Sequence, residues 1–256
     1  DVSVMHDGIR QNTASQSARP LDTFTLASVE VLKGPSSVIY GEGAVGGAVN
    51  YVSKSPDPTP QAEALLSYGS WNSTRVAAGA GGPTGVENLN FRLDASDNST
   101  DGYVANNHSE YRAVAGSLGW QPAADTKVTW YETYLQDSTQ NYYGTPVVYD
   151  AVVNATTGVE SVGQASAAID RLVNAHLDPA TLGLNYDNLD NFVHAENSFS
   201  RLVVDQRLGE HWSLSNAVYV ATQHLNWRNT ESYTWNPATQ LVHRSSFLLI
   251  WRQDQQ

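Results

Sequence analysis

The sequence predicts a mainly β protein, in which a small α/β unit is followed by about eight antiparallel strands. Three observations predict this fold class. Residues 29–54 are expected to form strand, tight turn, one helical turn, glycine corner and strand, because two β-rich runs flank a Pro and several Gly. From residue 61 on, alternating segments of roughly ten residues are separated by turn-forming Gly, Asn, Asp and Pro. The longest apolar run, 247–251, is far too short for a membrane-spanning helix.

The composition narrows the classes of protein. Of the 256 residues, 41% are hydrophobic but only 16% are charged, so part of the surface is expected to face something other than water. The formal charge is −12 and Lys and Arg do not cluster, which argues against a nucleic-acid partner. The chain contains no Cys, which permits an oxidising compartment without requiring one.

The N-terminal residues predict a strand that enters a loop. Residues 2–10 alternate in polarity and contain a turn signal at Asp7-Gly8. Residues 11–20 are polar in composition, as expected of a loop, and residues 21–28 predict a short turn of helix that leads back into the sheet. Residues 55–60 alternate with Pro, which cannot donate to a β-ladder, and therefore mark a stiff junction.

The alternation after the junction is clearest in residues 88–96, where Leu, Phe and Ala oppose Asn, Arg, Asp and Ser. One face suits lipid and the other suits water, as in a transmembrane β-barrel, and a large β-sandwich is the alternative. The eight predicted strands are residues 61–71, 74–81, 88–96, 109–120, 126–137, 199–208, 211–226 and 239–252.

The connections between these strands alternate in length, as outer-membrane barrels require. Residues 97–107, 138–195 and 229–238 are the long ones. The connection over 138–195 is far longer than compact domains usually contain without a function. Within it, apolar residues recur at helical spacing from Ala165 to Leu177, which predicts a small helix over the mouth of the barrel.

Residues 29–54 closely resemble the end of the plug domain of TonB-dependent outer-membrane receptors. The resemblance is carried by Val-Glu-Val-Leu-Lys-Gly-Pro at 29–35, Tyr40-Gly41, Gly46-Gly47 and Asn-Tyr-Val-Ser-Lys at 50–54, in the family order and spacing. It implies the C-terminal part of a plug at 1–54, a Pro-rich junction at 55–60 and the N-terminal part of a transmembrane barrel at 61–256. The complete barrel of such a receptor has about 22 strands.

The resemblance also implies a function and its partners. The protein is expected to bind a ferric siderophore in the bacterial outer membrane and to import it with energy transmitted by TonB, through a contact segment upstream of this chain. Its surroundings would be outer-membrane lipid, and the full-length receptor would be a monomer. Iron would enter only as part of the cargo, with no cofactor. Cobalamin or sugar cargo, a porin-like channel and a soluble β-rich binding domain are the alternatives.

Candidate site residues follow from the same resemblance. Ferrichrome-type receptors carry Tyr-Tyr-Gly at the start of the third external loop, which corresponds to Tyr142, Tyr143 and Gly144, although Thr145 stands where that type has an aromatic residue. A structural role of these aromatics at the rim stays open. Further candidates are three aromatics near another loop and three residues of the loop at the plug apex: Trp227, Tyr233, Trp235, Ser15, Gln16 and Arg19.

No catalytic or metal-binding arrangement occurs among the Ser, His and acidic residues, so an enzyme is not expected. The charge of the long connection bears on the cargo instead. Residues 138–196 contain Arg171 as their single cation, against seven acidic residues. Such a loop should repel an anionic chelate, within a screening length of about 8 Å at physiological salt. A neutral or cationic chelate, such as a ferric hydroxamate, is therefore favoured.

Overall fold

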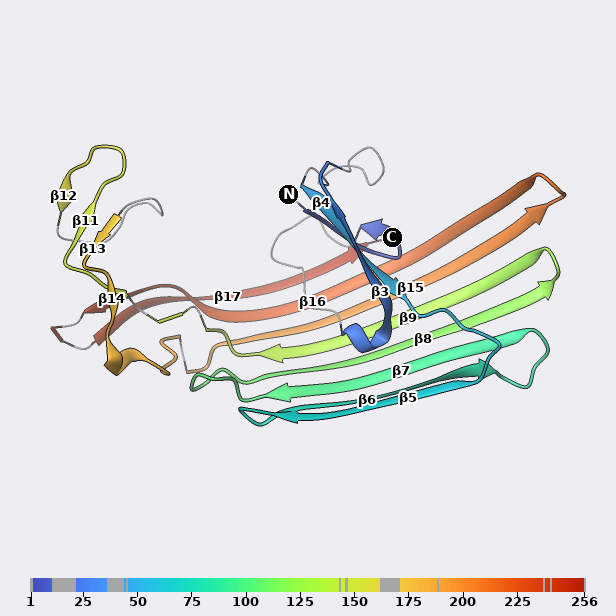
Figure 1. The fold of residues 1–256 in the computed structure, drawn as a ribbon, viewed down its shortest axis with the longest axis horizontal. Helices are drawn as coiled ribbons and strands as arrows, with labels where there is room; N and C mark the ends of the chain where they lie inside the picture. Colours follow the sequence, from blue (N-terminus) through green and yellow to red (C-terminus); the bar gives the residue numbers. More distant parts are fainter. Residues whose placement is uncertain are drawn as a thin grey trace.

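The structure is a computed structural model and describes residues 2–10, 22–35, 44, 46–142, 144–145, 147–161, 171–187, 189–236, 238–239 and 241–255. It contains a small sheet of four strands that stands on one side of a large sheet of eight (Figure 1). Among the described residues, no helix is long and apolar enough to cross a membrane.

The small sheet has the order β2-β1-β4-β3, in which β1 and β4 are parallel and the other pairs are antiparallel. Its strands are β1 (Val2–His6), β2 (Ile9–Arg10), β3 (Leu26–Lys33) and β4 (Gly47–Ser53). The predicted turn joins β1 to β2, and both of its residues adopt positive φ, 50° at Asp7 and 78° at Gly8. The predicted helical turn before β3 is the 3₁₀ helix η1 (Thr23–Thr25).

The glycine corner before β4 is needed for close backbone packing. Gly47 has φ of +146°, and a Cβ there would lie 2.5 Å from the carbonyl oxygen of Leu32 on the neighbouring strand. Most of the segment between β3 and β4, with its predicted helical turn, lies outside the described residues.

The large sheet confirms the eight antiparallel strands, in the order β17-β16-β15-β9-β8-β7-β6-β5. They are β5 (Gln61–Gly69), β6 (Ser73–Pro83), β7 (Leu89–Thr100), β8 (Ser109–Ala123), β9 (Thr126–Thr139), β15 (Phe192–Leu208), β16 (Trp212–Asn236) and β17 (Leu241–Gln255). The tight connections β6–β7, β8–β9 and β15–β16 lie at one end of the sheet. The connection between β9 and β15 lies at the other end, on the left in Figure 1.

The long connection differs from its prediction in two ways. Its strands reach further than expected, since β9 ends at Thr139 and β15 begins at Phe192, so the loop is shorter than 138–195. In the described part of the predicted helix, the chain is extended instead, and no helical turn precedes η2 (Pro179–Thr181). The loop strands are β10 (Val147–Val148), β11 (Ala151–Val153), β12 (Glu160–Ser161), β13 (Arg171–Val173) and β14 (His176–Leu177).

These short strands explain why the helix prediction was wrong over residues 171–177. β13 pairs with the Val-rich β11, and β14 pairs with β10, so Leu172, Val173 and Leu177 are taken up by strand pairing within the loop. The predicted loop at 229–238 was also wrong over most of its length, because β16 continues to Asn236 and pairs with β17. Thr, Tyr and Trp in this stretch favour strands.

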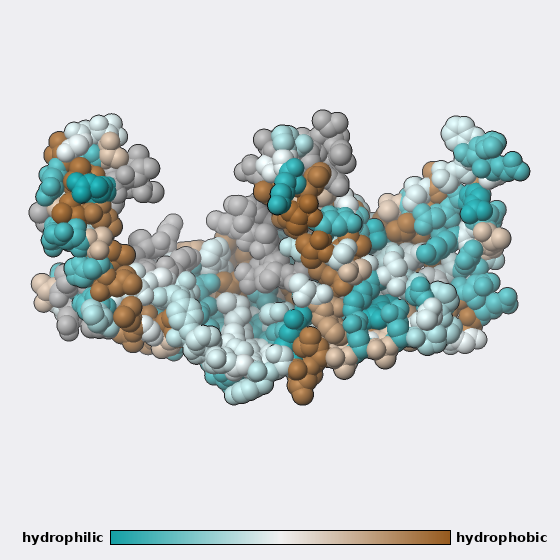
Figure 2. All heavy atoms as spheres, viewed as in Figure 1, coloured by the Kyte–Doolittle hydropathy of each residue, from teal (hydrophilic) through white to brown (hydrophobic). Residues whose placement is uncertain are grey.

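The large sheet carries polar residues on the face toward the small sheet and apolar residues on the other face. On β7, Arg92, Asp94, Ser96 and Asn98 are at most 7% exposed, whereas Leu93 between them is 52% exposed. Figure 2 shows a group of apolar residues projecting from the lower side of the molecule near its middle. A sheet that faces water would have the opposite distribution, so the outer face suits lipid, as the alternation predicted.

Candidate functional site

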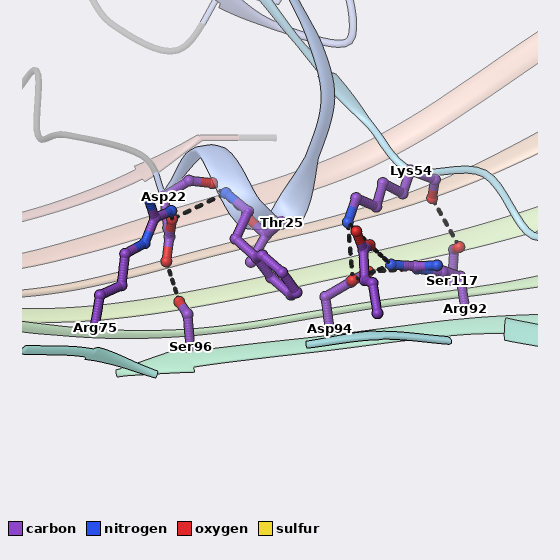
Figure 3. A network of polar contacts seen from close by, with 10 residues as sticks. Asp22, Thr25, Lys54, Arg75, Arg92, Asp94, Ser96 and Ser117 are labelled. Carbon is purple, nitrogen blue, oxygen red and sulfur yellow. Dashed lines mark hydrogen bonds and ion pairs between the residues drawn. The ribbon is translucent and has the colours of Figure 1, made fainter. Parts of the chain in front are cut away.

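Three polar contacts fix the small sheet to the large one, and Figure 3 shows the first two of them. The first contact is formed by Asp22. It caps η1, accepting a hydrogen bond from the backbone N–H of Phe24 at 2.9 Å, and its side chain is fully buried. From the large sheet, Arg75 on β6 forms an ion pair with it at 2.6 Å, and Ser96 and Asn98 on β7 donate hydrogen bonds.

These partners set the ionisation of Asp22. Burial alone would raise the pKa of the carboxyl, but hydrogen bonds from Ser96 and Phe24 and the charge of Arg75 outweigh it. The pKa of Asp22 therefore lies below its ordinary value, and the carboxylate form is the one that the contact stabilises.

Lys54, directly after β4, forms the second contact. Its ammonium group pairs with Glu63 on β5 and, at 3.0 Å, with Asp94 on β7, while Arg92 bridges the same two carboxylates. Asp94 is 1% exposed and Arg92 is 5% exposed, so the pair at the centre of this four-residue cluster is almost completely shielded from water. It has no room for a larger residue at Gly79, whose Cβ would overlap Asp94 and Arg92.

The third contact joins the β1–β2 turn to β15. Asp7 pairs with Arg201 at 3.1 Å and also accepts hydrogen bonds from the backbone and hydroxyl of Ser53 at 2.8 and 2.7 Å. Next to it, the His6 ring stacks on Phe199 with centroids 4.5 Å apart. Burial and the charge of Arg201 lower the pKa of His6, and they outweigh the charge of Asp7, which would raise it. The neutral imidazole is therefore the form that packs there.

The Pro-rich junction is packed against the large sheet. Ser117 on β8 donates to the carbonyl of Lys54 at 3.0 Å. A Cβ on Gly119 would lie 2.7 Å from Cγ of Pro56, and one on Gly82 would lie 3.0 Å from Cα of Pro60. The absence of side chains at these two glycines therefore lets both prolines lie directly on the strands.

At the end of the sheet that carries the long connection, three aromatic rings form a row. Tyr142, a predicted binding residue, lies edge-to-face on Tyr103 at 5.7 Å, and Tyr103 lies edge-to-face on Trp71 at 6.2 Å. Tyr142 also forms a hydrogen bond of 2.7 Å with Thr145, whereas Trp71 and Tyr103 are each 60% exposed. We call these three residues the rim aromatic row.

Trp71 and Tyr103 were missed as candidates. They lie in the β5–β6 and β7–β8 connections, and in an antiparallel sheet alternate connections meet at the same end. Counting the predicted strands would therefore have placed Trp71 and Tyr103 at the same end of the sheet as Tyr142, which lies at the start of the β9–β15 connection.

The other predicted binding residues are placed less completely. Trp227 on β16 packs against a cluster of Val193, Ala195 and Leu225 and lies edge-to-face on Phe247 at 5.3 Å. Tyr233 and Trp235 belong to β16 by their backbone. Ser15, Gln16, Arg19 and Tyr143 lie outside the described residues. Within the described part of the chain, no three His or acidic residues gather as metal ligands would.

Comparisons with known proteins agree with this architecture. Residues 1–48 match the family described as TonB-dependent receptor plug domain. The chain is 32% identical over 139 residues to a ferrioxamine receptor of Yersinia enterocolitica, covering 54% of this chain and 19% of that protein. It is 25% identical over 125 residues to the ferrichrome outer membrane transporter/phage receptor of Escherichia coli K12, covering 48% of this chain and 17% of that protein.

A solved structure shows the same fold. The ferric-catecholate import receptor Fiu from E. coli K12, in its open form, superposes with a TM-score of 0.75 at 18% identity, covering 98% of this chain and 37% of that one. The chain spans about a fifth of the length of the curated relatives it matches. Residues 1–48 are thus similar to the plug domain of TonB-dependent receptors, and the chain as a whole has the fold of the corresponding part of a solved receptor.

Proposed function

We propose that this chain is the plug and adjoining barrel wall of a receptor that binds a ferric siderophore and imports it with energy transmitted by TonB. Residues 1–54 would act as the plug, 55–60 as the junction and 61–256 as the wall with its external loops. The observation that carries the proposal is the polar face of the large sheet, which is buried against a small sheet in the family's plug region.

This arrangement favours a gated receptor over an open channel. A porin-like protein would need a water-filled interior, whereas here three ionic contacts hold the small sheet against the wall. Transport would then be differential binding between two arrangements of the plug, and no bond of the cargo would be broken. Cobalamin or sugar cargo is the alternative within the same class.

The relatives and the charge of the third loop support a hydroxamate cargo. Close to β15, part of the negative charge of this loop is neutralised by a strand residue, since Arg228 on β16 pairs with Asp190. Asp150 and Glu160, both exposed, add negative charge in the distal part of the loop. A multiply anionic tris-catecholate would be repelled there, while a neutral or cationic ferric hydroxamate would not.

Growth of an iron-starved host tests this function. The full-length receptor is produced in a strain that lacks its own hydroxamate and catecholate receptors, with and without a functional tonB gene. We expect rescue by a ferric hydroxamate such as ferrioxamine B, no rescue by a tris-catecholate, and loss of rescue without TonB. Rescue by the tris-catecholate alone would overturn the cargo assignment, and rescue by neither chelate would contradict a siderophore receptor.

Tyr143→Ala is expected to weaken binding of the ferric hydroxamate. A Tyr in the third external loop offers a flat apolar face and a hydroxyl, so its truncation should cost about 1–3 kcal/mol, or roughly five- to a hundredfold in affinity. Affinity is measured by fluorescence quenching of the purified full-length receptor. Tyr143→Phe is the matched variant, since a residue that only packs in the loop would tolerate it. Unchanged affinity of Tyr143→Ala at unchanged thermal stability would remove Tyr143 from the site.

A further inference from the structure

The segment just before β15 is bound to the β7–β8 connection, to the residues that follow β9, and to the strands β16 and β17. We call it the loop base and define it as residues 183–187 with Asp190 and Asn191. It closes the long connection between β9 and β15, whose distal part carries the small strands β10 to β14. Figure 1 shows β11 to β13 rising on the same side of the large sheet as the small sheet. The distal part of the loop therefore depends on this base for its position.

Asn185 joins the base to two neighbouring connections. Its side-chain amide donates to the backbone carbonyl of Asn106, in the β7–β8 connection, at 2.7 Å and to that of Asn141, two residues after the end of β9, at 2.8 Å. Its side-chain oxygen accepts from the N–H of Asp187 at 3.0 Å. Every polar atom of this side chain is thus used in holding backbone groups.

Asn191 holds the same target from the other side. Its side-chain oxygen accepts the backbone N–H of Asn141 at 2.6 Å, and Asn191 is only 2% exposed. The backbone N–H and the carbonyl of Asn141 are therefore both bound by side chains of the loop base. Asn141 directly precedes Tyr142, whose ring belongs to the rim aromatic row.

The base itself is fixed to the next strands. Asp187, which is 3% exposed, accepts the backbone N–H of Thr230 at 2.9 Å, where the pairing of β16 with β17 shifts register. Arg244 on β17 donates to the carbonyls of Tyr186 and Asp187 at 3.1 and 2.7 Å. A loop carboxylate thus binds the backbone of β16 directly beside this irregularity.

We propose that Asn185 and Asn191 are positioning residues, which hold Asn141 by both backbone groups and thereby fix Tyr142 in the rim aromatic row as a preformed surface for the ferric chelate. This inference rests on the proposed function. A ring that is already ordered loses less entropy on binding than one that must be immobilised. The ordering of one such side chain corresponds to roughly two- to tenfold in affinity.

The test uses the purified full-length receptor and the variants Asn185→Asp and Asn191→Ala. Asn185→Asp keeps the size of the side chain and its acceptor but removes both donations. Asn154→Ala is the matched control, because Asn154 caps a turn in the distal loop and does not contact the base. Two quantities are measured: affinity for the iron complex of ferrioxamine B, and amide hydrogen exchange at residues 141–145 without ligand.

Both base variants are expected to weaken ferrioxamine B binding by roughly two- to tenfold and to speed exchange at 141–145, with unchanged thermal stability. Asn154→Ala should change neither quantity. If the wild type binds and the variants bind equally well, or if exchange at 141–145 is unchanged, the inference is wrong. If the wild type binds no ferric chelate, the proposed function fails, and the exchange data alone still decide whether the two residues position Asn141.

Discussion

Replacing Asp22 with alanine is expected to release the small sheet from the large one at a cost of about 3–5 kcal/mol, as for a buried ion pair that loses one partner. The substitution leaves Arg75 without its carboxylate, removes the acceptor for Ser96 and Asn98, and uncaps η1. The free energy of plug unfolding is measured in urea on the purified full-length receptor, from hydrogen exchange at the amides of β1 to β4.

Glu30→Ala is the control for this experiment. Glu30 belongs to the same small sheet but is exposed, where it accepts one hydrogen bond from Asn50 at 3.0 Å. Its removal should cost less than about 1 kcal/mol. Equal destabilisation by the two substitutions would show that Asp22 has no special role in fixing the small sheet to the large one.

The contact of Asp22 should also weaken in acid. Because its pKa is lowered on folding, the unfolded chain binds the proton more readily than the folded one. The contribution is fully present above about pH 4 and is lost as the pH falls through the lowered pKa. In Asp22→Asn this part of the pH dependence should disappear, which separates it from the titration of other carboxylates.

Asp94→Ala is expected to open the second contact by a similar amount, about 3–5 kcal/mol. It leaves Arg92, which is 5% exposed, with only Glu63 as a carboxylate partner, and it removes the 3.0 Å pair with Lys54. Trypsin cleaves after Lys, so the rate of cleavage after Lys54 reports how often this residue is released from the wall. Where reclosing outpaces cleavage, that rate should rise roughly a hundredfold or more.

Asp97→Ala provides the comparison within the same strand. Asp97 pairs with Arg112 at 2.7 Å, but both side chains are more than half exposed, on the outer side of β7. Its loss should cost less than about 1 kcal/mol and leave cleavage after Lys54 unchanged. Similar cleavage rates in the two variants would contradict the assignment of Asp94 to the contact.

The strands of the large sheet could be predicted because their signal is local. In β7 the alternation of Phe91 and Leu93 with Arg92 and Asp94 fixes both the strand and its two faces. The turn at Asp7-Gly8 was predictable for the same reason, since the two residue types carry their backbone preference with them.

The loop and the contacts between the sheets could not be predicted from local patterns. Leu172 and Leu177 have helical spacing, but each pairs with a strand residue at least twenty positions earlier, and this pairing decides their conformation. Asp22 reads as an ordinary helix cap in sequence, and nothing near it indicates that Ser96 and Asn98 will surround it. Asn185 and Asp187 bind backbone groups of Asn106, Asn141 and Thr230. Every residue type has such groups, so the sequence does not indicate these contacts.

The three contacts of the small sheet have a consequence for the order of assembly. Each reaches forward along the chain: from Lys54 to Asp94 across 40 residues, from Asp22 to Asn98 across 76, and from Asp7 to Arg201 across 194. Synthesis begins at the N-terminal side, so the plug segment exists before the strands that complete it, and closing such long loops is slow.

The residues of the small sheet are therefore synthesised early, but the last of their contacts can form only after β15 has joined the large sheet. Until then Asp7, Asp22 and Lys54 lack their charged partners on the large sheet, and their charges are expected to stay hydrated, because an unpaired charge is costly to bury. The residues that fix the small sheet in the finished structure are thus expected to disfavour its docking before the large sheet has formed.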